Sequence, residues 1–524
     1  MKKKIIGILV CMLLIATAVP AVTSVKNSTI NAIVPSHPLP SMAGSWTETQ
    51  KLLAADGVAG DQFGSLSLDG DTALIGAWGH DDNGADSGAA YVFIRTGATW
   101  TLQQKLLASD GQADDSFGSC VSLEGDTALV GAGWDDDNGV DSGSAYVFTR
   151  TGTIWTQQAK LLPADGAVGD LFGGAVSLSG DTALIGADQD NDNGHWSGSA
   201  YVFTRTGTTW TQQAKLLAPD GATEDLFGWW ISLDSNTALI AAKWDDDNGD
   251  KSGSAYVFTR TGTTWTLQQK LIGSDTAAGD RFGVDVCLDG DTAIIGACYD
   301  DDMGTDSGSA YVFTRTGTTW TQQAKLLASD GAADDSFCGD TGCTSIDGDT
   351  AIIGAWYNDD KGTNSGSAYV FTRTGSTWTQ QQKLLSSDGA AGDSFGGATA
   401  LDGDTALICS WFDDDMGINS GSVYAFTKVV LTVGITGGFG VNLKITNNGL
   451  INATDVAWQI HVEGGILGRI NKTVNGTVDI PAGETVTVKT GMLFGFGAIS
   501  ITAKVADEEQ TATGTQIIIF SMVK

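Results

Sequence analysis

Residues 117–162 read FGSCVSLEGDTALVGAGWDDDNGVDSGSAYVFTRTGTIWTQQAKLL, and variants of this unit recur seven times in the 524-residue chain, at a spacing of about 55 residues. Each copy holds four short apolar runs separated by turn residues, without helical periodicity. Four antiparallel strands per repeat at this period predict one blade of a β-propeller. Its tryptophan recurs at Trp46, Trp100, Trp155, Trp210, Trp265, Trp320 and Trp378, and its first phenylalanine at Phe63, Phe117, Phe172, Phe227, Phe282, Phe337 and Phe395.

The repeat begins and ends out of phase. The chain enters it at the tryptophan segment of Trp46, and the seventh unit stops at Lys428 without such a segment. The Trp46 strand can complete the seventh blade, which would remove both exposed sheet edges. We therefore predict an all-β fold, a seven-bladed β-propeller closed by the N-terminal strand, in preference to an open superhelical solenoid.

The Phe-Gly and Gly-Ala pairs of each unit resemble the FG-GAP repeat, found in the seven-bladed head of integrin α-chains and in many prokaryotic surface proteins. The resemblance implies a propeller that binds extracellular ligands. Calcium-binding integrin blades carry an Asp-x-Asp-x-Asp-Gly loop between their first two strands. Here that link has shortened to Asp69-Gly70-Asp71 and its equivalents, so the integrin calcium site is not carried over.

The segments outside the repeat suggest three further regions. Residues 1–21 hold three lysines, an apolar stretch and Val19-Pro20-Ala21, which is typical of a secretory signal peptide. Residues 22–45 are predicted to be a flexible leader, and residues 46–428 form the propeller. Alternating segments in residues 429–524 predict a small immunoglobulin-like β-sandwich that resembles the CARDB domains of prokaryotic surface proteins.

The formal net charge of -34 excludes nucleic acid and anionic membrane surfaces as partners. No apolar run after the signal is long enough to span a bilayer. We expect a monomer that is secreted or held at the cell surface and binds an extracellular protein or a carbohydrate.

Two aspartate-rich loops per unit are expected on the same face of the propeller, because connections in a four-stranded meander alternate between its two ends. The loop after the second strand carries an aspartate and, two residues later, a glycine in every unit. Clustered carboxylates beside such a glycine suit Ca²⁺, whereas a solvated Asx-type turn without metal is the alternative. The predicted Ca²⁺ ligands are Asp82, Asp137, Asp192, Asp247, Asp302, Asp360 and Asp415.

Aromatic residues accompany these loops, and we predict that some of them bind a ligand: Trp134, Trp244, Tyr299, Tyr357 and Phe412. The alternative is that they pack between blades.

Cys338 and Cys343 flank a three-residue insertion that only the sixth unit carries. Their proximity in a secreted chain predicts a local disulfide.

The near-interchangeable units argue against catalysis, since an active site needs unique residues and no unit holds a distinctive acid–base pair. We expect a non-catalytic binding or adhesion protein that presents a multivalent acidic face, with Ca²⁺ as the candidate ion for its loops. A structural spacer or surface-layer component is the alternative, followed by a secreted enzyme acting on polysaccharide.

Overall fold

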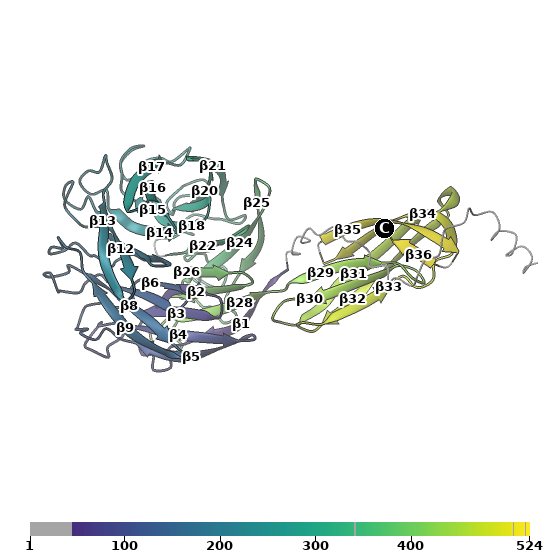
Figure 1. Cartoon of the computed structure of the whole chain (residues 1–524), viewed down its shortest axis with the longest axis horizontal. Helices are drawn as coiled ribbons and strands as arrows, with labels where there is room; N and C mark the ends of the chain where they lie inside the picture. Colours follow the sequence, from purple (N-terminus) through teal and green to yellow (C-terminus); the bar gives the residue numbers. More distant parts are fainter. Residues whose placement is uncertain (1–43, 340–341, 507, 519, 524) are drawn as a thin grey trace, which may run out of the picture.

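The computed structural model describes residues 44–339, 342–506, 508–518 and 520–523. These residues form nine antiparallel sheets, and their only helix is the single 3-10 turn η1 (Ile466–Gly468). Seven of the sheets have four strands each and lie around a common centre (Figure 1). The predicted all-β class with seven four-stranded blades is therefore confirmed.

The first six sheets each take four consecutive strands, the first strand of each lying innermost. They are β2 (Phe63–Asp69), β3 (Thr72–Ala77), β4 (Ala89–Thr96) and β5 (Thr99–Leu106); β6 (Val121–Glu124), β7 (Thr127–Ala132), β8 (Ser144–Thr151) and β9 (Ile154–Leu161); β10 (Val176–Ser179), β11 (Thr182–Ala187), β12 (Ser199–Thr206) and β13 (Thr209–Leu216); β14 (Phe227–Asp234), β15 (Thr237–Ala242), β16 (Ser254–Thr261) and β17 (Thr264–Leu271); β18 (Phe282–Asp289), β19 (Thr292–Ala297), β20 (Ser309–Thr316) and β21 (Thr319–Leu326); β22 (Thr344–Asp347), β23 (Thr350–Ala355), β24 (Ser367–Thr374) and β25 (Thr377–Leu384).

The seventh sheet joins the two ends of the repeat region. It contains β26 (Phe395–Asp402), β27 (Thr405–Ser410) and β28 (Ser422–Lys428), and its outermost strand is β1 (Trp46–Leu52). Trp46 lies opposite Lys428, and Leu52 lies opposite Val423. Neighbouring innermost strands contact one another in order from β2 to β26, and β26 in turn contacts β2.

The Phe-Gly pair fixes how each sheet meets the next one. Phe117 is fully buried and packs edge-on against Tyr146 and Phe148, with ring centroids 5.3 and 5.9 Å away. Gly118 has φ +93, and a Cβ there would lie 2.3 Å from the carbonyl oxygen of Ala89 in the preceding sheet. A side chain at this position would push the two sheets apart.

On the face opposite the aspartate-rich loops, an arginine in each of the first six sheets ties that sheet to its neighbour, and the seventh sheet has Lys428 instead. Arg150 Nε donates to Asp126 Oδ1 at 2.6 Å, and its Nη1 donates to Thr72 Oγ1 of the preceding sheet at 3.1 Å. The guanidinium also lies 5.1 Å from the centroid of the Trp155 ring. This arginine therefore balances the charge of the Asp-Gly-Asp turn on this face.

The residues after β28 build two further sheets around one shared apolar core. The smaller sheet has the order β29 (Leu431–Thr436), β30 (Asn442–Asn447), β33 (Thr485–Lys489). The larger has the order β32 (Ile470–Ile480), β31 (Ala453–Gly464), β34 (Gly495–Val505), β35 (Glu508–Ile518), β36 (Phe520–Val523). Two facing sheets agree with the predicted sandwich, and its immunoglobulin-like assignment stays a prediction. The predicted signal peptide and all but the end of the leader lie outside the described residues.

Truncating Leu52 in β1 should weaken the whole propeller. Its side chain is 2% exposed and belongs to the core shared by the first and seventh sheets, so Leu52→Ala should cost about 2–5 kcal/mol of unfolding free energy in urea. Thr47→Ala, at an exposed position of the same strand, should cost less than about 0.5 kcal/mol. Equal effects would mean that β1 does not close the seventh sheet in solution.

Candidate functional site

A lysine at the end of each outermost strand lies among the carboxylates of the aspartate-rich loops. In the second sheet, Lys160 Nζ lies 3.0 Å from Asp110, 2.9 Å from Asp135 and 2.6 Å from Asp137. The lysine side chain is only 14% exposed and that of Asp135 only 4%. One ammonium thus contacts two loops that β6 and β7 separate along the chain.

A buried tyrosine completes this lysine cluster. The Tyr146 hydroxyl, which has one proton to donate, lies 3.0 Å from Asp110 Oδ1 and 2.8 Å from Asp135 Oδ2, and Lys160 Nζ lies 5.0 Å from the tyrosine ring centroid. Burial acting alone would lower the pKa of Lys160, but its hydrogen bonds with Asp137, Tyr146 and Asp135 outweigh this effect and raise the pKa. The ammonium is therefore charged throughout the physiological pH range.

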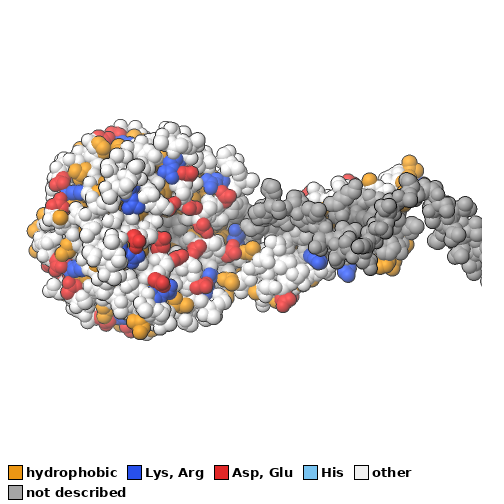
Figure 2. Space-filling model, viewed as in Figure 1, with side chains coloured by type: hydrophobic (Ala, Val, Ile, Leu, Met, Phe, Trp, Pro, Cys, Tyr) orange, Lys and Arg blue, Asp and Glu red, His pale blue; other side chains and the backbone are white. Residues whose placement is uncertain are grey.

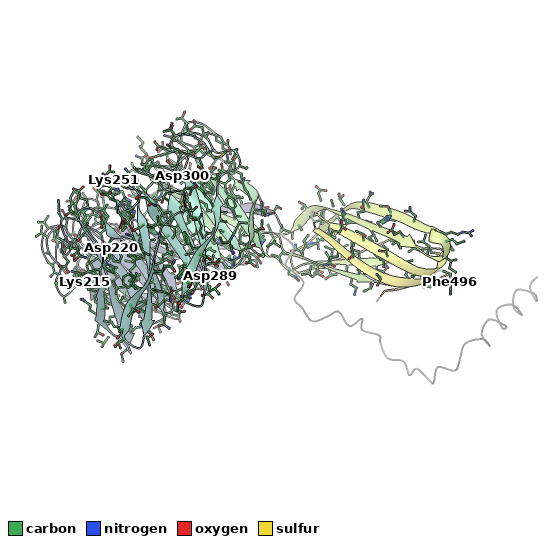
Figure 3. The ribbon with its side chains drawn as sticks, turned by 90° about the horizontal axis from the view of Figure 1, so that it is seen from above. Lys215, Asp220, Lys251, Asp289, Asp300 and Phe496 are labelled. Carbon is green, nitrogen blue, oxygen red and sulfur yellow. The ribbon has the colours of Figure 1, made fainter. Side chains whose placement is uncertain are left out.

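The lysine cluster recurs in all seven sheets. Lys215, Asp220 and Asp300, labelled in Figure 3, belong to three different copies of it. His80 in the first sheet and Asn358 in the sixth replace the buried aspartate. The seven lysines are Lys51, Lys105, Lys160, Lys215, Lys270, Lys325 and Lys383.

Each of the seven predicted Ca²⁺ ligands is in contact with one of these lysines. The distance from lysine Nζ to the carboxylate of the predicted ligand lies between 2.5 and 2.8 Å in every sheet. The seven aspartates are thus separated into seven clusters that already hold a cation. An ion entering a cluster would have to displace or share the ammonium, and Ca²⁺ binding there stays a prediction.

The role of these lysines was not predicted from the sequence, although each of them recurs once per unit at the end of the outermost strand. The lysine of the Lys-Leu-Leu marker ends the outermost strand, and the alternation of connections places that end on the face of the two acidic loops. Figure 2 shows acidic and basic side chains interspersed over the visible face of the propeller. The acidic face is less electronegative than the loop sequences alone indicate.

The aspartate two residues before the first phenylalanine of each unit caps a turn. Asp115 Oδ2 accepts a hydrogen bond from the Gln112 backbone N–H at 2.6 Å. Burial raises the pKa of Asp115 to about 6, and it raises that of Asp225 in the fourth sheet to about 6 as well.

A pocket of about 700 Å³ opens where the innermost strands begin, at the centre of the face that carries the acidic loops. Residues from the start of β2, β6, β10, β14, β22 and β26 form its wall. Polar side chains of Gln62, Asp86 and Asp114 stand among its lining residues. Aromatic side chains from five sheets supply much of the rest: Trp78, Trp134, Trp230, Trp356, Trp411 and Phe412.

Only two of the five predicted ligand-binding aromatics, Trp134 and Phe412, line this pocket. The other three are in contact with neighbouring side chains: Trp244 lies 4.1 Å from Lys251 Nζ, Tyr299 lies 4.4 Å from the Arg281 guanidinium, and Tyr357 stacks on Trp356 at 4.7 Å. Two of the predicted residues therefore lie at the pocket, which is also lined by tryptophans one residue earlier in the loop: Trp78, Trp356 and Trp411. Ligand binding by these residues stays a prediction.

The predicted disulfide between Cys338 and Cys343 is not formed in the structure. Both residues are free thiols, 0% and 1% exposed. The Cys343 thiol instead contacts the Gly339 carbonyl oxygen at 3.1 Å and the Asp285 carboxylate at 3.5 Å. The insertion therefore directs this thiol toward polar groups of its own loop and of the neighbouring sheet.

Comparison with known proteins identifies the repeat. The family described as FG-GAP repeat matches residues 46–93, 100–148, 155–203, 210–258, 265–313, 320–371 and 378–426, which is more than half of the chain. The chain belongs to the FG-GAP repeat family.

Two further comparisons concern curated proteins and solved structures. No curated protein matches the chain. Among solved structures, the chain is similar to the crystal structure of Saccharomyces cerevisiae Sqt1, with 11% identity, a TM-score of 0.40, and coverage of 77% of this chain and 97% of that one. Among the residues that the structure describes, none belongs to a helix with the length and apolar character that a membrane crossing requires.

Removing one cluster lysine should destabilise the protein and create a demand for another cation. Lys160→Met leaves three carboxylates around an empty centre, so we expect a loss on the order of 2–3 kcal/mol in urea unfolding, below the value for a fully buried pair because two of the carboxylates are partly exposed. Added Ca²⁺ should restore part of this loss, whereas EDTA and Ca²⁺ should leave the melting temperature of the wild-type protein unchanged.

The matched control is Lys504→Met, which removes an exposed ion pair with Glu509 at 2.7 Å and should cost at most about 1 kcal/mol. A wild-type protein that melts earlier in EDTA would show instead that the loops bind metal beside the lysine.

Stability should also vary with pH in a defined window. Asp115 and Asp225 keep their protons to about pH 6 in the folded chain, while the unfolded chain releases them near its ordinary pKa of about 4. The folded state therefore binds more protons between these values, and its stability should fall as pH rises from about 4 to 6. Melting temperatures measured from pH 4 to 8 should show this fall, and Asp225→Asn should reduce it. A melting temperature that rises through this window would contradict the assignment.

Proposed function

We propose that this protein is a non-catalytic binding module that acts outside the cell and holds a neutral or amino sugar in the pocket at the centre of its acidic face. The main support for this function is the set of aromatic side chains around the pocket. They occupy positions where the repeat varies: the residue after the second strand is Trp78, Trp356 or Trp411 in three units, but Gly133, Asp188, Lys243 or Cys298 in the others. Departures of this kind within a near-identical repeat are expected where one ligand is recognised.

The chemistry of the pocket suits a carbohydrate. Its volume of about 700 Å³ falls within the range of about 300–1,000 Å³ typical of small-molecule sites, which combine apolar walls with a few polar groups. Indole rings offer flat apolar faces to the C–H faces of a sugar ring. The side chains of Gln62, Asp86 and Asp114 offer partners for its hydroxyl groups.

One further group supports a polar ligand. The indole N–H of Trp411 is buried, its residue is 7% exposed, and it has no hydrogen-bond partner among the described residues. A buried donor without an acceptor is costly, and a ligand hydroxyl could supply that acceptor.

Charge selects among sugars. The two carboxylates of the lining and a net charge of -34 disfavour acidic sugars and favour neutral or amino sugars. Calcium is not required for this binding, because the loop aspartates are already paired with lysines.

Placement outside the cell is part of the proposal. It is supported by the signal-like residues 1–21 and by the resemblance of the repeats to integrin α-chain heads and prokaryotic surface proteins. The predicted CARDB-like character of residues 429–524 fits the same setting, with the sandwich carrying the propeller.

Trp134→Ala should weaken sugar binding by at least about tenfold, since aromatic contacts at the centre of a site contribute more than about 1 kcal/mol each. Trp134 is 44% exposed, so its removal should leave folding intact. The ligand is selected first on a glycan array, and affinities are then measured by tryptophan fluorescence and calorimetry.

The matched control is Trp244→Ala, which removes a tryptophan from the equivalent loop position outside the pocket and should leave affinity unchanged. An array without any bound glycan would overturn the proposal and favour a structural spacer. Cleavage of a bound glycan would instead identify an enzyme acting on polysaccharide.

A further inference from the structure

Three buried side chains with metal-ligating atoms converge where the fifth and sixth sheets meet. A carboxylate oxygen of Asp285 and the thiol sulfurs of Cys338 and Cys343 all lie within 4.8 Å of one another. All three residues are at most 1% exposed. The other such group among the described residues, at Asp56, His80 and Asp82, already contains the ammonium of a cluster lysine.

Asp285 departs from the repeat at this place. It precedes Val286, which pairs with Ile295 of the second strand, and the equivalent position of every other unit is uncharged. Those residues are Ser65, Cys120, Ala175, Trp230, Cys343 and Ala398. A carboxylate has thus replaced a neutral side chain in the innermost strand of one sheet alone.

Cys338 departs from the repeat as well. It stands where the Phe-Gly pair of every other unit has glycine, and it keeps a left-handed backbone with φ +66. A side chain in this conformation is strained by about 1 kcal/mol or more, and such strain concentrates at functional sites. The three-residue insertion of the sixth unit follows directly and leads to Cys343.

The Asp285 carboxylate is oriented with one oxygen left over. Its Oδ2 accepts hydrogen bonds from the backbone N–H and the hydroxyl of Thr344, both at 2.7 Å, and lies 3.5 Å from Cys343 Sγ. Its Oδ1 is buried and has no hydrogen-bond partner among the described residues. An anionic oxygen buried without a partner is costly, so this arrangement has the form of a ligand whose second oxygen is held by outer-shell hydrogen bonds.

We propose that Asp285, Cys338 and Cys343 bind a thiophilic divalent cation of the Zn²⁺ class. Two thiolates and a carboxylate are ligands that Zn²⁺ takes, at about 2.3 Å from sulfur and about 2.0–2.2 Å from oxygen. Ligand atoms on one such ion can lie at most about 4.6 Å apart, and the three atoms here all lie within 4.8 Å of one another. Binding releases the two thiol protons to solvent, and a water molecule completes the fourth position.

The site would brace the wall of the central pocket. Gly342 and Thr344, which flank Cys343, line that pocket, and Thr344 also holds Asp285. An ion here links β18 to the insertion before β22 and fixes the part of the wall that the insertion has altered. The inference rests on this cluster alone and stands whether or not the pocket binds a sugar.

The test uses the full chain, reduced with a phosphine and stripped of metal, and titrates it with Co²⁺. We expect one Co²⁺ per chain with the near-ultraviolet charge-transfer absorption of a thiolate-bound ion, and displacement of that ion by Zn²⁺. Asp285→Asn, Cys338→Ser and Cys343→Ser should each weaken Co²⁺ binding by at least about tenfold. Cys409→Ser, which removes a buried thiol in the seventh sheet, should leave it unchanged.

Native mass spectrometry of the wild-type protein keeps the proposal falsifiable if a variant fails to fold. The expected species carries one Zn²⁺ and has lost two protons. A metal-free chain after Zn²⁺ addition would overturn the proposal. A metal-free chain lacking two hydrogens, restored by reductant and unable to bind Co²⁺ afterwards, would assign the two thiols to the originally predicted disulfide.

Discussion

A lysine ammonium shared by carboxylates from two loops is the interaction on which this propeller depends. The meander brings two aspartate-rich loops of every sheet to the same face, and their charges would repel one another across the short distances between them. Lys160 and its equivalents lie between those loops and contact up to three carboxylates each. The hydroxyl groups of Tyr146 and its equivalents form hydrogen bonds with carboxylates of the same clusters. The repeat thus carries its own counter-ion as a side chain, where other acidic loops use a metal.

This arrangement separates the repeated residues from those that can recognise a ligand. The recurring phenylalanine, glycine, arginine, tyrosine and lysine all have structural partners within their own sheet or its neighbour. What distinguishes one sheet from another is confined to a few positions near the centre of the propeller. The pocket tryptophans and the Asp285–Cys338–Cys343 group are of this kind, and they lie side by side at the wall that Thr344 shares.

Much of the fold could be predicted from the sequence because each strand and turn is repeated seven times. The offset between Trp46 and Lys428 predicted the pairing of β1 with β28, which the register confirms. The lysine clusters were also predictable in principle, since the same alternation that groups the loops places the end of the outermost strand beside them. They were missed because the Lys-Leu-Leu marker was interpreted only as part of a strand.

The pocket and the metal-ligating group could not be derived in this way. The two residues after the second strand are adjacent in sequence, and the repeat pattern does not say which of them faces the centre. Trp411 is buried at the pocket, whereas Tyr357 stacks on Trp356. Asp285 and Cys338 belong to different units and meet only through the packing of adjacent sheets. The predicted disulfide rested only on the short sequence distance between Cys338 and Cys343. It did not include the Asp285 carboxylate, which lies near both thiols.

In the structure a lysine ammonium occupies each acidic loop pair. NMR of the protein with ¹⁵N-labelled lysine tests it most directly, because ammonium groups held in buried hydrogen bonds exchange their protons slowly. We expect seven slowly exchanging lysine ammonium signals at neutral pH that do not change when Ca²⁺ or EDTA is added. Rapid exchange of these groups, or their loss on addition of Ca²⁺, would contradict it.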